Sequence, residues 1–288
     1  MRSIVKDYYQ LTKPGVLYGN VLTGAAGFLL ASAGAVDGWL FLAAIGGMTL
    51  VIAAACVINN YLDRDIDQIM ERTKNRPSVV GTVSSANILR FGVILALLGF
   101  ASLALWTNWL VVVIGAIGFI TYVWLYGTLS KRRSIHGTLV GSISGAMPIA
   151  GGYAAVSGAV DLGLIIVFLI MFFWQFPEFY SIAIYRKKEY AAAHLPVMPV
   201  IKGVRATIVQ IFIYTILYVI ATLLLVVFGY VGTAYAFVVS IMGLYWIYLG
   251  YLGLRHPRPA VWAKEMFKFS MWTILVLCVM LALGPVLP

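Results

Sequence analysis

Charged residues are scarce in this chain. Only 10% of its 288 residues are Asp, Glu, Lys or Arg, whereas 62% are hydrophobic. A soluble domain of this length needs far more polar surface to cover its core, so the composition excludes that class. Histidine and cysteine are also rare, with three and two residues, and neither type is spaced as in a metal cluster. Cys56 and Cys278 lie inside apolar segments, where we expect packed, unreactive thiols.

Long apolar runs, in contrast, recur along the whole sequence. A helix needs about 20 apolar residues to cross a hydrocarbon layer of ~30 Å. No polar stretch between the runs is long enough for a separate soluble domain, so we expect an all-α, polytopic membrane protein with one transmembrane domain over 1–288. Between charged or turn-rich breaks the sequence predicts nine spans, at 16–34, 38–60, 88–106, 108–128, 136–157, 162–185, 205–229, 231–253 and 266–286.

The basic residues all fall on one side of these predicted spans. The 20 Lys and Arg residues lie before the first span or in and beside every second loop after it, whereas the other loops carry only Asp37 and Asp161. The positive-inside rule therefore predicts a multi-pass cell-membrane protein with its N-terminus and basic loops in the cytoplasm and its C-terminus outside. Topology accounts for the net charge of +10, so nucleic acid is not an expected partner. The basic face would attract anionic substrates or membrane lipid.

The fifth predicted span carries a stripe of small residues. Gly137, Gly141 and Gly145 follow one another at four-residue spacing. Small residues on one helix face let neighbouring helices approach closely. We therefore expect this helix near the centre of the bundle.

The strongest chemical pattern stands at the end of the second span. Asn59, Asp63 and Asp67 are spaced i, i+4, i+8, which places the three side chains in one row along a helix. An amide oxygen and two carboxylates suit Mg²⁺, a hard cation that prefers oxygen ligands and leaves positions for water and phosphate. Asp65 points away from the row and is expected to face Arg64, Arg72 or solvent.

Basic residues follow this row at once. Arg72, Lys74 and Arg76 could grip phosphate beside a carboxylate-bound metal, which together would make a diphosphate site. The alternative is a solvated loop in which acids merely balance bases. A second polar loop, 185–190, follows the sixth span and is expected to face the first loop across a cavity. A plain positive-inside loop is the alternative there.

These loops resemble those of a known family. Asn59-x3-Asp63-x3-Asp67 matches the first aspartate-rich motif of the UbiA-type intramembrane prenyltransferases, which implies a helical bundle around a central cavity. Several further blocks resemble the heme O synthase (protoheme IX farnesyltransferase) branch of that superfamily: 12–15, 59–67, 72–77, 131–132, 174–177 and 195–200.

The resemblance implies a reaction and its partners. A farnesyl group would pass from farnesyl diphosphate to a vinyl group of heme B, and addition of water would give heme O. It also implies heme A synthase or a terminal oxidase as a protein partner. Residues expected to bind diphosphate or heme propionates are Arg72, Lys74, Arg76, Lys131, Arg132, Arg186 and Lys202, with Tyr61 and Tyr185 offering π faces to an allylic cation.

The chain departs from the family pattern at two positions. Glu178 stands after Pro177, where the family usually has histidine. An ionisable group inside a span is costly unless it faces a cavity or a partner, so we expect Glu178 to line the active site. Glu189 and Tyr190 stand where the branch has Asp-Tyr, and we expect them to take part in catalysis, Glu189 by reaching a second Mg²⁺.

Three other functions compete with this interpretation. A sister prenyltransferase acting on an aromatic or quinone precursor would keep the metal row and change the acceptor side. A transporter or channel would distribute ionisable residues near mid-membrane with access from both faces, whereas here charge collects on one face. A structural subunit would have no use for the acidic row.

Overall fold

The structure, a computed structural model, describes residues 4–288. In that range it contains helices and no strand. The helices are α1 (Ile4–Leu11), α2 (Pro14–Ser32), α3 (Gly38–Leu62), α4 (Arg64–Ile69), α5 (Pro77–Val80), α6 (Ser85–Trp106), α7 (Trp109–Ile120), η1 (Thr121–Ser130), α8 (Lys131–Arg133), α9 (Gly137–Ser157), α10 (Leu162–Tyr185), α11 (Lys187–Ala192), α12 (Met198–Ile201), α13 (Val204–Val227), α14 (Thr233–Gly253) and α15 (Pro259–Leu283).

Nine helices among the described residues are long and apolar enough to cross a membrane, as the sequence predicted. They are α2, α3, α6, the continuous run Trp109–Arg133, α9, α10, α13, α14 and α15. The ends differ from the prediction most at α15, which begins at Pro259 rather than near 266. Hydropathy marks only the apolar part of a helix, whereas helical hydrogen bonding continues through Lys264 and Glu265.

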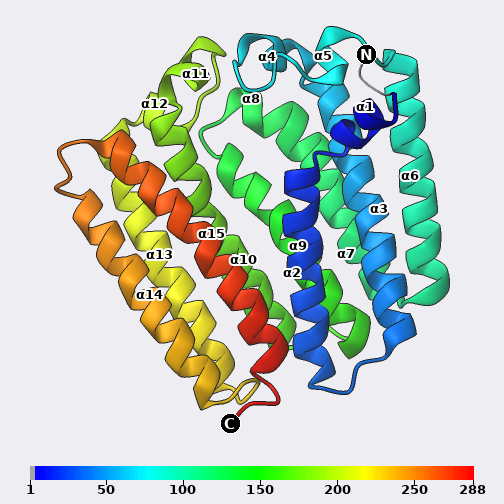
Figure 1. Cartoon of the computed structure of the whole chain (residues 1–288), viewed down its shortest axis with the longest axis vertical. Coiled ribbons are helices and arrows are strands. Elements are labelled where there is room, and N and C mark those ends of the chain that lie inside the picture. The colour runs from blue at the N-terminus through cyan, green and yellow to red at the C-terminus, as the bar shows by residue number, and fades with distance from the viewer. Residues whose placement is uncertain (1–3) are drawn as a thin grey trace.

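The short elements gather at one end of the bundle. Figure 1 shows α1, α4, α5, α8, α11 and α12 together at that end and the C-terminus at the opposite end. The loops expected to carry the chemistry therefore lie near one another, as the alternating charge pattern required.

Helix α9 occupies a central position, which confirms the expectation from its glycines. It packs against α2, α7, α10 and η1. A Cβ atom at Gly145 would lie only 2.0 Å from Gln175 Oε1 of α10. Helix α9 approaches α2 as closely as it approaches α10, because a Cβ at Gly152 would lie 1.9 Å from the carbonyl oxygen of Gly24.

The fourth span changes its helical pitch where it meets the polar end of the bundle. Thr121–Ser130 forms a π-helix, η1, between α7 and α8. Such wide turns are rare and occur frequently at functional sites. Here Gly127 lies against the end of α3, where an added Cβ would be 3.3 Å from Asn59 Nδ2.

The α2–α9 contact predicts a strong effect of one methyl group. Gly152→Ala should destabilise the bundle by about 1–3 kcal/mol, because the new Cβ overlaps a backbone atom that cannot move alone. Thermal unfolding in detergent measures this. The matched control is Gly46→Ala in α3, where an added Cβ meets nothing within 4 Å. Equal stability of the two variants would contradict the expectation.

Candidate active site

The predicted row of oxygen ligands forms where α3 passes into α4. The Asp63 N–H donates to the Asn59 carbonyl (2.9 Å), and the Asp67 N–H donates to the Asp63 carbonyl (2.8 Å). These i→i+4 bonds carry the helical path across the break between the two helices. Asn59, Asp63 and Asp67 are only 2%, 1% and 3% exposed. Three polar side chains are therefore buried in one row at the end of a spanning helix.

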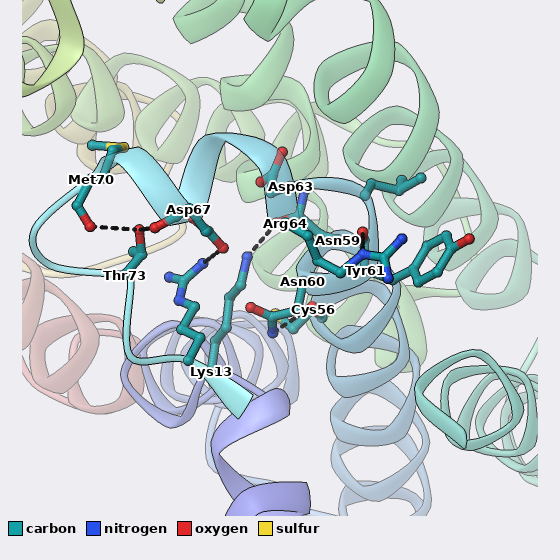
Figure 2. A network of polar contacts seen from close by, with 12 residues as sticks. Lys13, Cys56, Asn59, Asn60, Tyr61, Asp63, Arg64, Asp67, Met70 and Thr73 are labelled. Carbon is teal, nitrogen blue, oxygen red and sulfur yellow. Dashed lines mark hydrogen bonds and ion pairs between the residues drawn. The ribbon is translucent and has the colours of Figure 1, made fainter. Parts of the chain in front are cut away.

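Each member of the row is held by a cation from a different part of the chain. Lys13 donates to Asn59 Oδ1. Lys131 Nζ lies 2.6 Å from Asp63 Oδ2, and Arg76 Nη1 lies 2.6 Å from Asp67 Oδ2. Figure 2 shows Lys13 reaching up to the row from below it. Burying a charge is costly unless it is paired, and these contacts compensate for burial of the carboxylates.

Lys13 was not among the residues singled out from the sequence. It precedes α2 with φ of 51°, a left-handed conformation that costs a non-glycine residue of order 1 kcal/mol. Backbone strain of this kind clusters at functional sites. Burial and, to a smaller extent, the neighbouring Arg76 charge lower the pKa of Lys13 to about 8. The only available signal was the block Thr12-Lys13-Pro14-Gly15, which resembles the heme O synthase branch and identifies no partner for the lysine.

Asp65 is turned to solvent as expected, but its partner is neither Arg64 nor Arg72. Arg132 donates to both Asp65 carboxylate oxygens, at 2.6 and 2.7 Å, and to the Leu62 carbonyl oxygen at 2.8 Å. The Arg132 guanidinium holds the pKa of Asp65 down at about 2. Arg132 therefore ties η1 and α8 to the end of α3, and both of its terminal nitrogens donate within the protein.

The two polar loops touch one another directly. Ile66 and Met70 after the acidic row pack with Ala193 and Leu195 after α11 in one small apolar cluster. Tyr190 packs against the same cluster. Burial raises the pKa of Tyr190, and the positive charges of Arg72, Lys131 and Arg186 oppose that rise. The second loop thus brings its tyrosine to the cations of the first.

The remaining basic candidates differ in how free they are. Arg72 is exposed and makes no hydrogen bond or ion pair within residues 4–288, so its guanidinium is available to a ligand. Arg186 pairs with Glu189 at 3.0 Å, and Lys74 pairs with Glu71 at 2.7 Å. Lys202 is exposed at the end of α12, with no side-chain contact to the row.

The tyrosines beside the row are not those expected from the sequence. Tyr61 packs with the Leu11 and Val57 cluster and lies under the Arg64 guanidinium at 4.2 Å, turned away from the carboxylates in Figure 2. Tyr185 stacks edge-on against Phe267. The rings near the row are Tyr122 and Tyr126 of η1, which stack at 5.9 Å.

Tyr122 lies 6.0 Å from the Lys13 ammonium group, which places this ring pair at the Asn59 end of the row. No sequence pattern revealed it, because side-chain direction in a π-helix does not follow the ordinary 3.6-residue period.

The donor set fits a divalent metal ion. Asp63 Oδ1 is buried and accepts no hydrogen bond within residues 4–288, and Arg132 Nη2 stands 3.8 Å from it. All donors in the row are hard oxygens, the type that Mg²⁺ prefers. Within the described residues no cluster of three or more His, Cys, Asp or Glu side chains exists, so a bound ion would complete its shell with water or substrate oxygens.

A family model provides the first comparison with known proteins. The UbiA prenyltransferase family matches residues 20–274, which is most of the chain. The chain belongs to the UbiA prenyltransferase family. It is therefore an integral membrane prenyltransferase, which excludes the transporter and structural-subunit alternatives.

Relatives within the UbiA family match nearly the full length. A protein from Chromohalobacter salexigens named "Protoheme IX farnesyltransferase" is 47% identical over 280 residues, covering 97% of this chain and 95% of the relative. A Pseudomonas putida protein named "Protoheme IX farnesyltransferase 2" is 47% identical over 277 residues, covering 96% and 94%.

Solved structures share the UbiA fold at low sequence identity. A digeranylgeranylglyceryl phosphate synthase has a TM-score of 0.82 at 20% identity, with 98% of each chain covered. A UbiA homolog from Archaeoglobus fulgidus, bound to DMAPP and Mg²⁺, has a TM-score of 0.68 at 14% identity, covering 96% of this chain and 99% of that one. At these identities the likeness establishes the fold.

The Asp65–Arg132 pair predicts a pH-dependent effect on stability. Asp65 has a folded-state pKa below its usual 3.8, so the pair stabilises the fold above about pH 4, and the stabilisation disappears as the pH falls toward 2. Because Asp65 is largely exposed, Asp65→Asn should cost less than about 1 kcal/mol at neutral pH. Thermal unfolding of both proteins from pH 2 to 7 measures this. A gap between them that widens toward pH 2 would contradict it.

Proposed function

We propose that this chain transfers the farnesyl group of farnesyl diphosphate to a vinyl group of heme B, and that addition of water completes the side chain of heme O. The observation that carries this proposal is the buried row of Asn59, Asp63 and Asp67 faced by cations from three parts of the chain. Relatives that match nearly the whole chain are named protoheme IX farnesyltransferase, and these names support heme B as the acceptor.

Mg²⁺ would be held by Asn59, Asp63 and Asp67. The ion would supply positive charge that stabilises the leaving diphosphate as the allylic carbon–oxygen bond breaks. Asp63 Oδ1, which has no hydrogen-bond partner among the described residues, would be one of its ligands.

The protein's own cations would bind the diphosphate beside the metal. Arg72 has free donors, and Arg76 and Lys131 already stand at hydrogen-bonding distance from the carboxylates. Each could bind an oxygen of the diphosphate beside the metal, and the two arginines could each do so with two parallel hydrogen bonds. Arg186, Lys74 and Lys202 lie farther out and would attract the anionic diphosphate or the heme propionates.

The allylic cation would form next to the η1 ring pair. Tyr122 and Tyr126 present π faces at the end of the row, a suitable surface for a desolvated cation. In this proposal they replace Tyr61 and Tyr185, which the fold uses elsewhere. The product would pass to heme A synthase or a terminal oxidase.

The central test is a turnover assay with purified protein, heme B, farnesyl diphosphate and Mg²⁺, with products identified by mass. Asp63→Asn should lower turnover by about 100-fold or more, because it weakens both the metal and the Lys131 contact. The matched control is Asp65→Asn, an acid of the same segment outside the row, which should retain activity. An active Asp63→Asn variant would overturn the assignment of the row. Prenylation of an aromatic acceptor in place of heme would move the chain to the sister branch.

We also propose that the end of the bundle bearing the site faces the cytoplasm, since all 20 basic residues lie before the first span or in and beside the loops of that side. A single cysteine introduced at exposed Lys188 should resist a membrane-impermeant maleimide in intact cells and react after permeabilisation. The opposite labelling is expected for a cysteine at exposed Val160, in the loop between α9 and α10. Labelling of position 188 in intact cells would reverse the orientation.

A further inference from the structure

Helix α10 carries a carboxylate in the membrane-spanning part of the bundle. Glu178 lies about two turns, roughly 10 Å, from the end of α10 at Tyr185. Its direction follows from two neighbours on the same helix. Trp174 Nε1 donates to the Ser270 carbonyl oxygen of α15, and Gln175 Nε2 donates to the Ser142 carbonyl oxygen of α9. At 100° per residue, Glu178 points between these two directions, about 40° from Trp174 and 60° from Gln175.

Four helices enclose the space toward which Glu178 points. Helix α10 packs against α9 and α15, and α2 packs against both of these, so the four helices form a ring. Glu178 is nevertheless only half-buried. A side chain that points into a ring of helices and keeps some exposure lines a space that water can reach.

This carboxylate has no partner in the part of the chain that the structure describes. No hydrogen bond or ion pair in residues 4–288 involves Glu178, although unpaired acids inside a membrane are costly and rare. One turn toward the polar end, Ser181 Oγ is fully buried and also makes no hydrogen bond among these residues. Side chains at i and i+3 are neighbours on a helix, so a small polar molecule could bind both.

We propose that Glu178 is the general base for the addition of water to the farnesylated acceptor, with Ser181 helping to hold that water. This assignment rests on the proposed function, which needs a water molecule delivered to one carbon. An unpaired carboxylate facing an enclosed space, set deeper than the diphosphate site, has the required chemistry.

The C1–O bond of farnesyl diphosphate breaks and the diphosphate leaves with the electron pair. C1 then bonds to the terminal vinyl carbon, and the positive charge passes to the vinyl carbon attached to the porphyrin. The water oxygen bonds to that carbon, and the proton it loses goes to the Glu178 carboxylate. Without the base, the cation would lose a proton from carbon and give an unhydrated product lighter by one water.

The test compares product masses from wild type, Glu178→Gln and Glu178→Asp with heme B, farnesyl diphosphate and Mg²⁺. Glu178→Gln keeps the size and cannot accept the proton, so the hydrated product should fall about 100-fold while the unhydrated farnesylated heme accumulates. Glu178→Asp should restore part of the hydrated product. Glu178→Met, which suits an apolar interior, is the second variant if Glu178→Gln does not fold, and should show the same change in product ratio.

The matched control is Glu265→Gln, an exposed acid on α15 that should leave the product ratio unchanged. A hydrated product at the wild-type ratio from Glu178→Gln would overturn the proposal. The proposal would also be overturned if Glu178→Gln lost heme B binding in an absorbance titration while its remaining product kept the normal ratio of hydrated to unhydrated heme. Glu178 would then hold the acceptor. If wild type makes no farnesylated heme, the proposed function fails and this assignment with it. If wild type is active and Glu178→Gln still gives the hydrated product at the normal ratio, only the assignment of Glu178 fails and the proposed function stands.

Discussion

Neutralisation of buried carboxylates at the polar end of α3 is the constraint on which the rest of the structure depends. Asp63 and Asp67 could not remain ionised there without counter-charges, because removing an ion from water costs several kcal/mol. Lys131, Arg76 and, at Asn59, Lys13 supply those charges from three separate segments. The fold is therefore arranged so that α1–α2, the loop before α5 and the end of η1 converge on one helix end.

Apolar packing holds that convergence in place. Helix α2 approaches α9 closely through Gly24 and Gly152, and Lys13 directly precedes α2. The small cluster around Ile66 and Leu195 fixes the second loop against the first. The polar site is thus positioned by helix contacts that themselves carry no chemistry.

Helix α10 connects the polar end to the interior of the bundle. The chain after its polar end brings Arg186 and Tyr190 to the first loop, and its last two turns present Glu178 and Ser181 toward α2, α9 and α15. A substrate with an anionic head and a long apolar chain matches such an arrangement, since the charge can stay at the membrane boundary while the reacting carbon lies deeper.

The sequence by itself determined the nine spans, the common end for the basic loops and the spacing of Asn59, Asp63 and Asp67, because hydropathy, charge and helical period act over short distances. Only the tertiary structure decided which cation meets which acid. Lys13 and Lys131 lie 46 and 68 positions from their partners, and helix packing alone brings them together. The same holds for Tyr122 and Tyr126, whose direction depends on the π-helical turn of η1. Local pattern could locate the carboxylates and the nearby Arg76, whereas long-range packing selected Lys13 and Lys131 as their other partners.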